Sequence, residues 1–183
     1  MYTIRDATSS DAERLLEISS WYVEHTAVSF EYEVPTPEEF RRRIENTLKR
    51  YPYLVIEEGG RALGYAYAGP FKSRAAYDWA CEVSVYVDRD ARRRGLGRRL
   101  YEALESALSA MGILNLYACI AVPEAEDETL TLDSVRFHAR MGYVEAGHYR
   151  RCGYKFGRWY DMVWMEKMIG EHRPDQPPVR WPE

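Results

Sequence analysis

The sequence predicts a mixed α/β fold, with helices on both faces of a mixed sheet. Three observations lead to this fold class and to a single domain. Strand-like and helix-like segments alternate in the order β-α-α-β-β-β-α-β-α-β-β, which is typical of such sheets. The length of 183 residues suits one domain with a full core and is too short for two comfortable ones. No internal repeat is found, and we expect a single domain.

Seven segments carry the β-branched and aromatic residues that favour strands. They span residues 2–7, 53–57, 62–70, 81–87, 114–122, 143–147 and 160–167. Glu58-Gly59-Gly60, between the second and third of them, is a hairpin turn signal. The stretch 152–159 contains glycine and many aromatic residues, and it is expected to separate the last two strands.

Four helices are expected, each with a start or a stop signal. Ser10 with Glu13 starts a helix that reaches about residue 25. Thr36 with Pro37 and Glu39 starts a second helix, before the stretch 40–50. In 96–111, leucines recur at helical spacing on one face, and Gly112 is placed to end the helix. The short helix 135–141 is stopped by Gly142.

Composition and charge restrict the partners of this chain. A net charge of −4 and a pI near 5.7 argue against a general nucleic-acid binder, whose phosphate contacts need a basic face. The three cysteines are odd in number and widely spaced, which fits neither a disulfide framework nor a metal site and suggests a reducing compartment. The N-terminal residues lack the core of a signal peptide, and no apolar run approaches the roughly 20 residues of a membrane span. We therefore expect a soluble cytoplasmic protein whose partners are small molecules, without nucleic acid, membrane or metal.

A run of arginine and glycine, from Arg92 to Gly97, lies between the strand 81–87 and the helix 96–111. The N–H groups at a helix N-terminus, the helix dipole, the flanking arginines and the close approach that glycine allows all favour a phosphate. The run therefore indicates a pyrophosphate-binding loop. The patterns of a nucleotide-hydrolysing P-loop and of a dinucleotide-binding fold are both absent. From the residues alone, a solvated loop before a surface helix is the alternative.

Strand, R-x-x-G-x-G and helix in this order resemble the acetyl-CoA signature of the GNAT N-acetyltransferases. The order of elements is also similar to the GNAT fold, which implies a mixed, mostly antiparallel central sheet in a domain over 1–170. Residues 171–183 contain four prolines and are expected to form an extended tail. Four segments of the chain are, in addition, similar to segments of the phosphinothricin N-acetyltransferases. They are 71–79, Glu82 with 85–87, 135–143 and 153–159.

The resemblance implies transfer of acetyl from acetyl-CoA to the α-amino group of a small anionic amino-acid analogue. Phosphinothricin, methionine sulfoximine and methionine sulfone are of this type. The family is commonly homodimeric. Arg158, Trp159 and Tyr160 are expected to close the substrate pocket, from the same chain or from a partner subunit.

Glu82 is the first catalytic candidate. An amine attacks a thioester only when it is neutral, so the reaction needs a base. On a strand over 81–87, Glu82, Ser84 and Tyr86 share one face, while the three valines take the other. The residues alone leave an exposed acid on a half-buried edge strand equally open. The resemblance favours catalysis.

His138 is the second catalytic candidate and ranks below Glu82. The wider superfamily usually has a tyrosine at this place as general acid for the CoA thiolate, whereas the phosphinothricin enzymes resemble this chain in having histidine. Histidine can carry protons near neutral pH. A surface histidine on a short helix is the alternative.

The acid groups of such a substrate need cations. Lys72 and Arg74, two apart on one face if the segment is extended, are the candidates, and Tyr77 adds a hydroxyl donor. Without the resemblance, these charges are more simply explained as a solvated loop.

For acetyl-CoA, the backbone of 85–87 is expected to pair with the pantetheine, and the arginine and glycine run to hold the pyrophosphate. The residues assigned to the cofactor are Val85, Tyr86, Val87, Arg92, Arg93, Arg94, Gly95, Leu96, Gly97, Arg98, Thr131 and Ser134. Thr131 departs from the superfamily, which often has asparagine there. The loop 123–130, with its acidic run at 123–128, is a second departure, because extra carboxylates near the substrate mouth would repel an anion.

Three other functions stay open. The chain could acetylate another amine, such as a polyamine or a protein N-terminus. It could be a CoA-binding sensor without catalysis. It could use Cys81 or Cys119 in a ping-pong reaction, although a strand cysteine is more often core filling.

Overall fold

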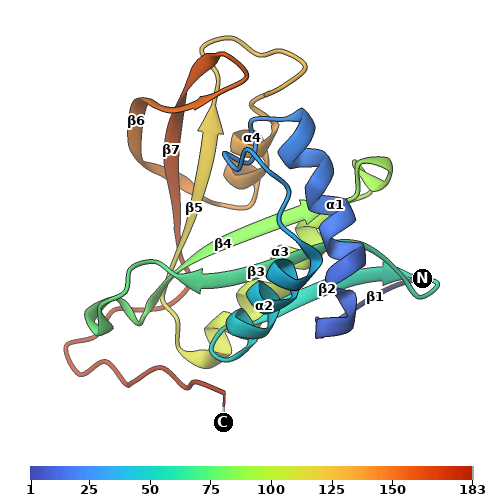
Figure 1. Ribbon diagram of the computed structural model, residues 1–183. Helices are drawn as coiled ribbons and strands as arrows, with labels where there is room; N and C mark the ends of the chain where they lie inside the picture. The colour runs from blue at the N-terminus through green and yellow to red at the C-terminus, as the bar shows by residue number, and fades with distance from the viewer. Residues whose placement is uncertain (183) are drawn as a thin grey trace. The chain divides into compact units, whose positions relative to one another are not determined.

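The computed structural model describes residues 1–182, and their internal contacts divide them into two compact units. The first unit contains residues 1–18, 35–116 and the chain from Met168 onward, and the second contains 19–34 and 117–167. The strands are β1 (Tyr2–Asp6), β2 (Tyr53–Glu58), β3 (Arg61–Pro70), β4 (Ala80–Val87), β5 (Asn115–Val122), β6 (Val144–Lys155) and β7 (Arg158–Met168) (Figure 1). The helices are α1 (Ala12–His25), α2 (Pro37–Leu48), α3 (Leu96–Met111) and α4 (Asp133–Arg140), with 3-10 turns η1 (Ser9–Asp11), η2 (Ala75–Tyr77) and η3 (Arg89–Ala91). A single domain over 1–170 followed by a tail stays a prediction.

The first unit is built on antiparallel strands in the order β1-β2-β3-β4. Residues 53–56 of β2 are all buried, as expected of an inner strand. Between β3 and β4, Tyr65 lies opposite Tyr86 and Gly69 lies opposite Glu82. Because paired residues share a face, the alternation expected for β4 is confirmed. The even-numbered side chains of β4 lie on the same face as Tyr65 of β3, and the valines of β4 lie on the other face.

Helices α2 and α3 pack on opposite faces of these strands. The ring of Phe40 in α2 meets that of Tyr65 edge-on, with centroids 6.3 Å apart. On the other face, a Cβ added to Gly64 would lie 3.4 Å from the Cδ1 atom of Leu100 in α3. The expectation of helices on both faces is therefore confirmed in this unit. α3 also ends where the sequence predicts, at Gly112, whose φ is +91°.

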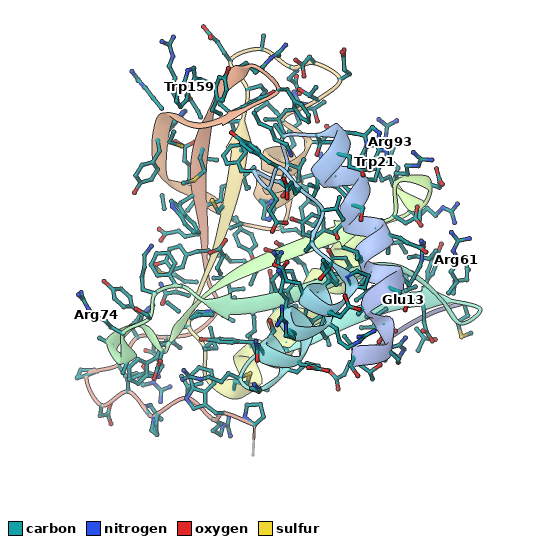
Figure 2. The ribbon with its side chains drawn as sticks, viewed as in Figure 1. Glu13, Trp21, Arg61, Arg74, Arg93 and Trp159 are labelled. Atoms are coloured by element: carbon teal, nitrogen blue, oxygen red, sulfur yellow. The ribbon has the colours of Figure 1, made fainter. Side chains whose placement is uncertain are left out.

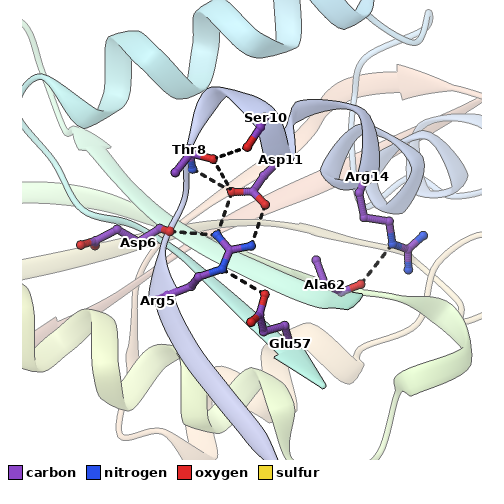
Figure 3. Close-up of polar contacts among 8 residues, drawn as sticks. All are labelled: Arg5, Asp6, Thr8, Ser10, Asp11, Arg14, Glu57 and Ala62. Atoms are coloured by element: carbon purple, nitrogen blue, oxygen red, sulfur yellow. Dashed lines mark hydrogen bonds and ion pairs between the residues drawn. The ribbon is translucent and has the colours of Figure 1, made fainter. Parts of the chain in front are cut away.

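One guanidinium group joins β1, η1 and β2 (Figure 3). Arg5 Nε donates to Glu57 at 3.0 Å, and the two terminal nitrogens donate to the Asp11 carboxylate at 2.8 and 2.7 Å. Asp11 Oδ2 also accepts from the N–H of Thr8 at 2.8 Å. These bonds fix the point at which the chain leaves the first strand and enters the first helix.

The start of this first helix differs from the sequence expectation. Thr8 and Asp11, and not Ser10 and Glu13, form the capping box, because the chain enters α1 through the earlier turn η1. The cap of the second helix is confirmed, since Thr36 Oγ1 accepts a backbone N–H at 3.1 Å.

In the second unit the strand order is β5-β7-β6, and β6 and β7 form a hairpin. Its turn is Phe156-Gly157, where φ is +52° and +74°, and a two-residue type I′ turn needs positive φ at both positions. The expectation that the stretch 152–159 separates the last two strands is wrong, since most of it is paired strand. β6 is exposed along most of its length, so no alternation of apolar residues marks it in the sequence.

A buried lysine fixes the segment that follows α1 in this unit. Lys155 Nζ donates to the carbonyls of Val23, Thr26 and Ser29 at 2.7, 2.9 and 2.7 Å. These carbonyls lie at or just beyond the C-terminal end of α1, where helix carbonyls lack intrahelical partners. The sequence analysis did not anticipate this cap, because the lysine lies far along the chain from the helix that it caps.

The C-terminal segment has no regular secondary structure, but it is attached to the first unit. Trp79 Nε1 donates to the carbonyl of Pro177 at 2.8 Å. Arg180 donates from its backbone N–H and from its guanidinium group to the carbonyls of 110 and 111, at 2.6 to 2.9 Å. Cations and donors are favourable at this end of a helix. The last residue of the expected tail, Glu183, lies outside the described residues.

Candidate functional site

Glu82 is half-buried on β4, and not exposed as the alternative interpretation required. Burial raises the pKa of Glu82 above its ordinary value, and the charge of Lys72 opposes that rise. A carboxylate with a raised pKa takes up a proton more readily, which suits a general base. The charge of Lys72 therefore acts on this carboxyl.

The other groups of the expected substrate segment are arranged less closely. Lys72 Nζ lies 4.9 Å from the centroid of the Phe71 ring, which meets the Tyr77 ring edge-on at 6.0 Å. After β3 the chain bends, so the extended geometry assumed for Lys72 and Arg74 is not found. Arg74 is exposed and projects outward (Figure 2). Its carbonyl accepts the N–H of Tyr77 at 2.9 Å.

The loop before α3 has the backbone geometry of an anion site. Arg93 and Gly95 have positive φ, of +62° and +75°. The bond from the N–H of Arg99 to the carbonyl of Gly95, at 3.2 Å, starts the α3 ladder. The amides of 96–98 come before that ladder and lie at the positive end of a helix of 16 residues. This arrangement fits a pyrophosphate group.

The arginines of this loop differ in their contacts. Arg94 donates to the carbonyl of Asp90 at 3.2 Å, and Arg98 Nε donates to the Glu102 carboxylate at 2.7 Å. Arg93 is exposed at the surface of the loop (Figure 2). An exposed ion pair such as that of Arg98 is weak, so it leaves the guanidinium group available to a stronger anion.

Sequence reasoning missed the group that holds this loop in place. Asp88, directly after β4, accepts the N–H of Asp90 at 2.9 Å and forms an ion pair with Arg14 of α1. Arg14 Nε also donates to the carbonyl of Ala62 at 3.1 Å (Figure 3). An aspartate that caps a turn right after a strand is a local signal that could have been recognised, whereas its pairing with Arg14 could not.

In the second unit, His138 lies on α4 and is buried, with 4 % of its surface exposed, so the alternative of a surface histidine is wrong. Its Nδ1 lies 2.7 Å from the carbonyl of Ser134, and only a protonated nitrogen can pair with a carbonyl. The ring of Tyr143 meets the imidazole edge-on at 5.3 Å. Burial lowers the pKa of His138. The imidazole is therefore mostly neutral at pH 7, with its proton on Nδ1.

The two cofactor residues expected near α4 lie at its start. Ser134 Oγ is 3.5 Å from Nδ1 of His138. Thr131 is exposed, and its hydroxyl accepts the N–H of Asp133 at 3.3 Å. The hydroxyl of Thr131 thus supports the first turn of the helix.

The acidic loop is less repulsive to an anion than its sequence suggests. Asp127 accepts from Thr129 and pairs with Arg158, and these contacts lower the pKa of Asp127 to about 2. Glu126 accepts two hydrogen bonds from Arg136, at 3.0 and 3.1 Å. Two of the expected extra carboxylates are therefore paired with arginines.

The three residues expected to close the substrate pocket have different environments. Arg158 pairs with Asp127, while Trp159 is 58 % exposed (Figure 2). Tyr160 is buried, and its hydroxyl lies 3.1 Å from that of Thr129. Arg158 and Trp159 line a hollow of about 580 Å³, together with Arg150, Arg151 and Asp161.

The cysteine hypothesis has no support at Cys81. Burial raises the pKa of the Cys81 thiol to about 12, which disfavours the thiolate that a nucleophile needs. Cys119 is exposed. Residues 1–182 hold no cluster of three or more side chains suited to a metal ion. No helix in this part of the chain combines the length and apolarity needed to cross a bilayer.

Comparison with known proteins extends this picture. The chain matches the family model described as an acetyltransferase (GNAT) domain over residues 4–164. It is 38 % identical over 174 residues to a phosphinothricin N-acetyltransferase of Streptomyces viridochromogenes, which covers 95 % of this chain and 91 % of that one. It is 32 % identical over 171 residues to an L-methionine sulfoximine/L-methionine sulfone acetyltransferase of Salmonella typhimurium, with 93 % and 96 % covered.

A solved structure shows the same fold. It is that of a GNAT superfamily phosphinothricin acetyltransferase from Sinorhizobium meliloti in complex with acetyl-CoA. The TM-score is 0.87 at 30 % identity, over 96 % of this chain and 92 % of that one.

Proposed function

Because the chain belongs to the GNAT acetyltransferase family and is an acetyl-CoA-dependent N-acetyltransferase, we propose that it acetylates the α-amino group of a small anionic amino-acid analogue. Phosphinothricin and methionine sulfoximine are the acceptors that we expect. The observation that carries this proposal is the half-buried Glu82 on which the charge of Lys72 acts. A base and a cation are thereby available to the amine and to the acid group of one acceptor.

Acetyl-CoA supplies an activated acetyl group as a thioester. Glu82 takes a proton from the acceptor ammonium, and Lys72 attracts the acceptor's acid group. The neutral nitrogen forms the new bond to the acetyl carbon and loses its second proton to solvent, and the carbon–sulfur bond breaks. The amides of 96–98 and the arginines beside them hold the pyrophosphate throughout.

We assign to His138 the return of a proton to the departing sulfur. Its Nδ1–H is donated to the Ser134 carbonyl, so the ring must gain a proton from solvent at Nε2 before it can give one. The lowered pKa of His138 makes the imidazolium a strong enough acid to release that proton readily. The net result is an N-acetyl product, free CoA thiol and one proton released to solvent.

The test is CoA release with phosphinothricin, methionine sulfoximine, glycine and spermidine as acceptors. We expect faster turnover of the first two. Glu82→Gln should lower kcat by about 10²- to 10⁴-fold, the usual contribution of a general base. Glu45→Gln, on the exposed surface of α2, is the matched control and should match the wild type. Turnover of spermidine alone would overturn the acceptor assignment, and unchanged kcat in Glu82→Gln would overturn the role of the base.

Lys72→Met tests the acid group separately. It should raise the KM of phosphinothricin more than that of glycine methyl ester, which has no acid group. Equal effects on both acceptors would contradict the assignment. We also propose a homodimer, which light scattering of the purified protein would detect.

A further inference from the structure

Gly69 on β3 lies directly opposite Glu82 on β4, on the same face of the sheet. In an antiparallel pair, the Cα atoms of such partners lie about 4.5–5.5 Å apart. A Cβ added to Gly69 would meet no atom within 4 Å. Its φ also lies outside the left-handed region, so neither packing nor backbone conformation requires glycine at this position. The absent side chain leaves an open space beside the half-buried carboxyl.

A second glycine on the same strand shows the contrast. A Cβ on Gly64 would lie 2.8 Å from the carbonyl oxygen of Tyr86 and 3.3 Å from the Cα of Val87. Gly64 is thus required by close packing between β3 and β4. Gly69 needs another explanation, because glycine inside a strand weakens it through backbone entropy.

The surroundings of this space match an acceptor site. Two pairs along the strands, and therefore on the same face, Tyr67 lies opposite Ser84, so an aromatic ring and hydroxyl groups lie on that side of the space. At the other end β3 finishes, and Lys72 follows with a charge that acts on Glu82. The open space therefore lies between polar neighbours and next to the proposed base.

We propose that Gly69 determines which acceptors reach Glu82. Its missing side chain leaves room for the substituted carbon that carries the acceptor amine, so the site takes a primary amine on a branched carbon. This inference rests on the proposed function and adds to it the residue that limits acceptor size. Gly69 is a specificity-determining position and takes no part in proton transfer.

The test uses Gly69→Ala and Gly69→Val, with Gly147→Ala as the matched control. Gly147 lies in β6, where an added Cβ would make an ordinary contact of 3.6 Å with the Tyr149 ring. The measurements are Tm, the KM of acetyl-CoA, and kcat/KM for phosphinothricin. An unwanted methyl group in a pocket typically costs about 10- to 200-fold in kcat/KM.

We expect Gly69→Ala to lose about tenfold or more in kcat/KM for phosphinothricin, and Gly69→Val to lose more. The KM of acetyl-CoA should stay within about twofold, because its pantetheine and pyrophosphate are assigned to other residues, 85–87 and 92–98. Tm should fall by no more than about 4 °C in Gly69→Ala. A kcat/KM within about twofold of the wild type in both variants would overturn the inference. So would a larger fall in Tm, since it would show that the space is filled.

The wild-type enzyme separates the two proposals. Turnover of phosphinothricin by the wild type, with unaffected Gly69 variants, would overturn this inference and leave the proposed function intact. No turnover of any amine by the wild type would overturn both.

Discussion

Asp88→Ala should weaken both the fold and the binding of acetyl-CoA. Asp88 is 11 % exposed and Arg14 is 25 % exposed, so their ion pair is partly shielded from water. Loss of the cap on the Asp90 N–H costs about 1 kcal/mol. Loss of the charged hydrogen bond costs about 1.5–2 kcal/mol, since Arg14 keeps its bonds to Glu17 and Ala62. The sum of about 2.5–3 kcal/mol lowers Tm by about 5–12 °C in a chain of this length.

The assay pairs urea unfolding with steady-state kinetics. Asp90→Ala is the control, because its side chain is 81 % exposed and its backbone N–H remains. The KM of acetyl-CoA should rise about tenfold in Asp88→Ala, which corresponds to about 1.4 kcal/mol of lost loop organisation. Equal stability and equal KM in the two variants would refute the reasoning.

The pH dependence gives the same prediction a second test. Burial alone would raise the pKa of Asp88, but the N–H of Asp90 and the Arg14 guanidinium hold it below its ordinary value. A depressed carboxyl pKa contributes stability that is complete above the unfolded value of about 4 and is lost as pH falls through the folded value. The stability gap between wild type and Asp88→Ala should therefore be full at pH 6 and close below about pH 4. A gap that does not change with pH would show that the charge of Asp88 is not what matters.

Three further predictions concern other parts of the chain. The acid limb of the kcat/KM profile against pH should lie above the ordinary pKa of glutamate, because burial raises the pKa of Glu82, and a limb at or below that value would contradict this. Lys155→Met should lower the free energy of unfolding in urea by about 2–4 kcal/mol, because three carbonyls lose a charged donor, whereas Lys49→Met on the surface should change it little. Gly64→Ala should cost about 1–3 kcal/mol by overpacking, and a variant as stable as Gly69→Ala would show that β3 and β4 are less closely packed than described.

Local signals predicted much of the fold. Gly95 and Gly112 mark the ends of α3 because each adopts a positive φ that other residues rarely take. The hairpin of β6 and β7 was misjudged because most of β6 is exposed, so its residues show no apolar alternation. The signal that could have corrected this was Phe156-Gly157, where glycine takes the second position of a two-residue turn.

The site was predicted less completely, because its environment is set by residues far apart in sequence. The pairing of Asp88 with Arg14 spans 74 positions, and that of Asp127 with Arg158 spans 31. No local pattern reports either of them. The burial of His138 likewise depends on its surroundings in the fold, which a short amphipathic helix does not reveal. Residue type and spacing thus identified candidates, whereas their charge state came from the tertiary structure.

The attachment of the C-terminal segment matters for anyone who expresses this protein. Arg180 donates to carbonyls at the C-terminal end of α3, and the arginine and glycine loop leads into the N-terminal end of the same helix. A fusion or affinity tag placed after Glu183 would begin four residues beyond Arg180, next to a segment that supports the helix. Met1 is fully exposed, and its amino group forms an exposed ion pair with Glu58 at 3.5 Å. The N-terminus is therefore the better place for a purification handle, and a C-terminal one should be removed before acetyl-CoA affinity is measured.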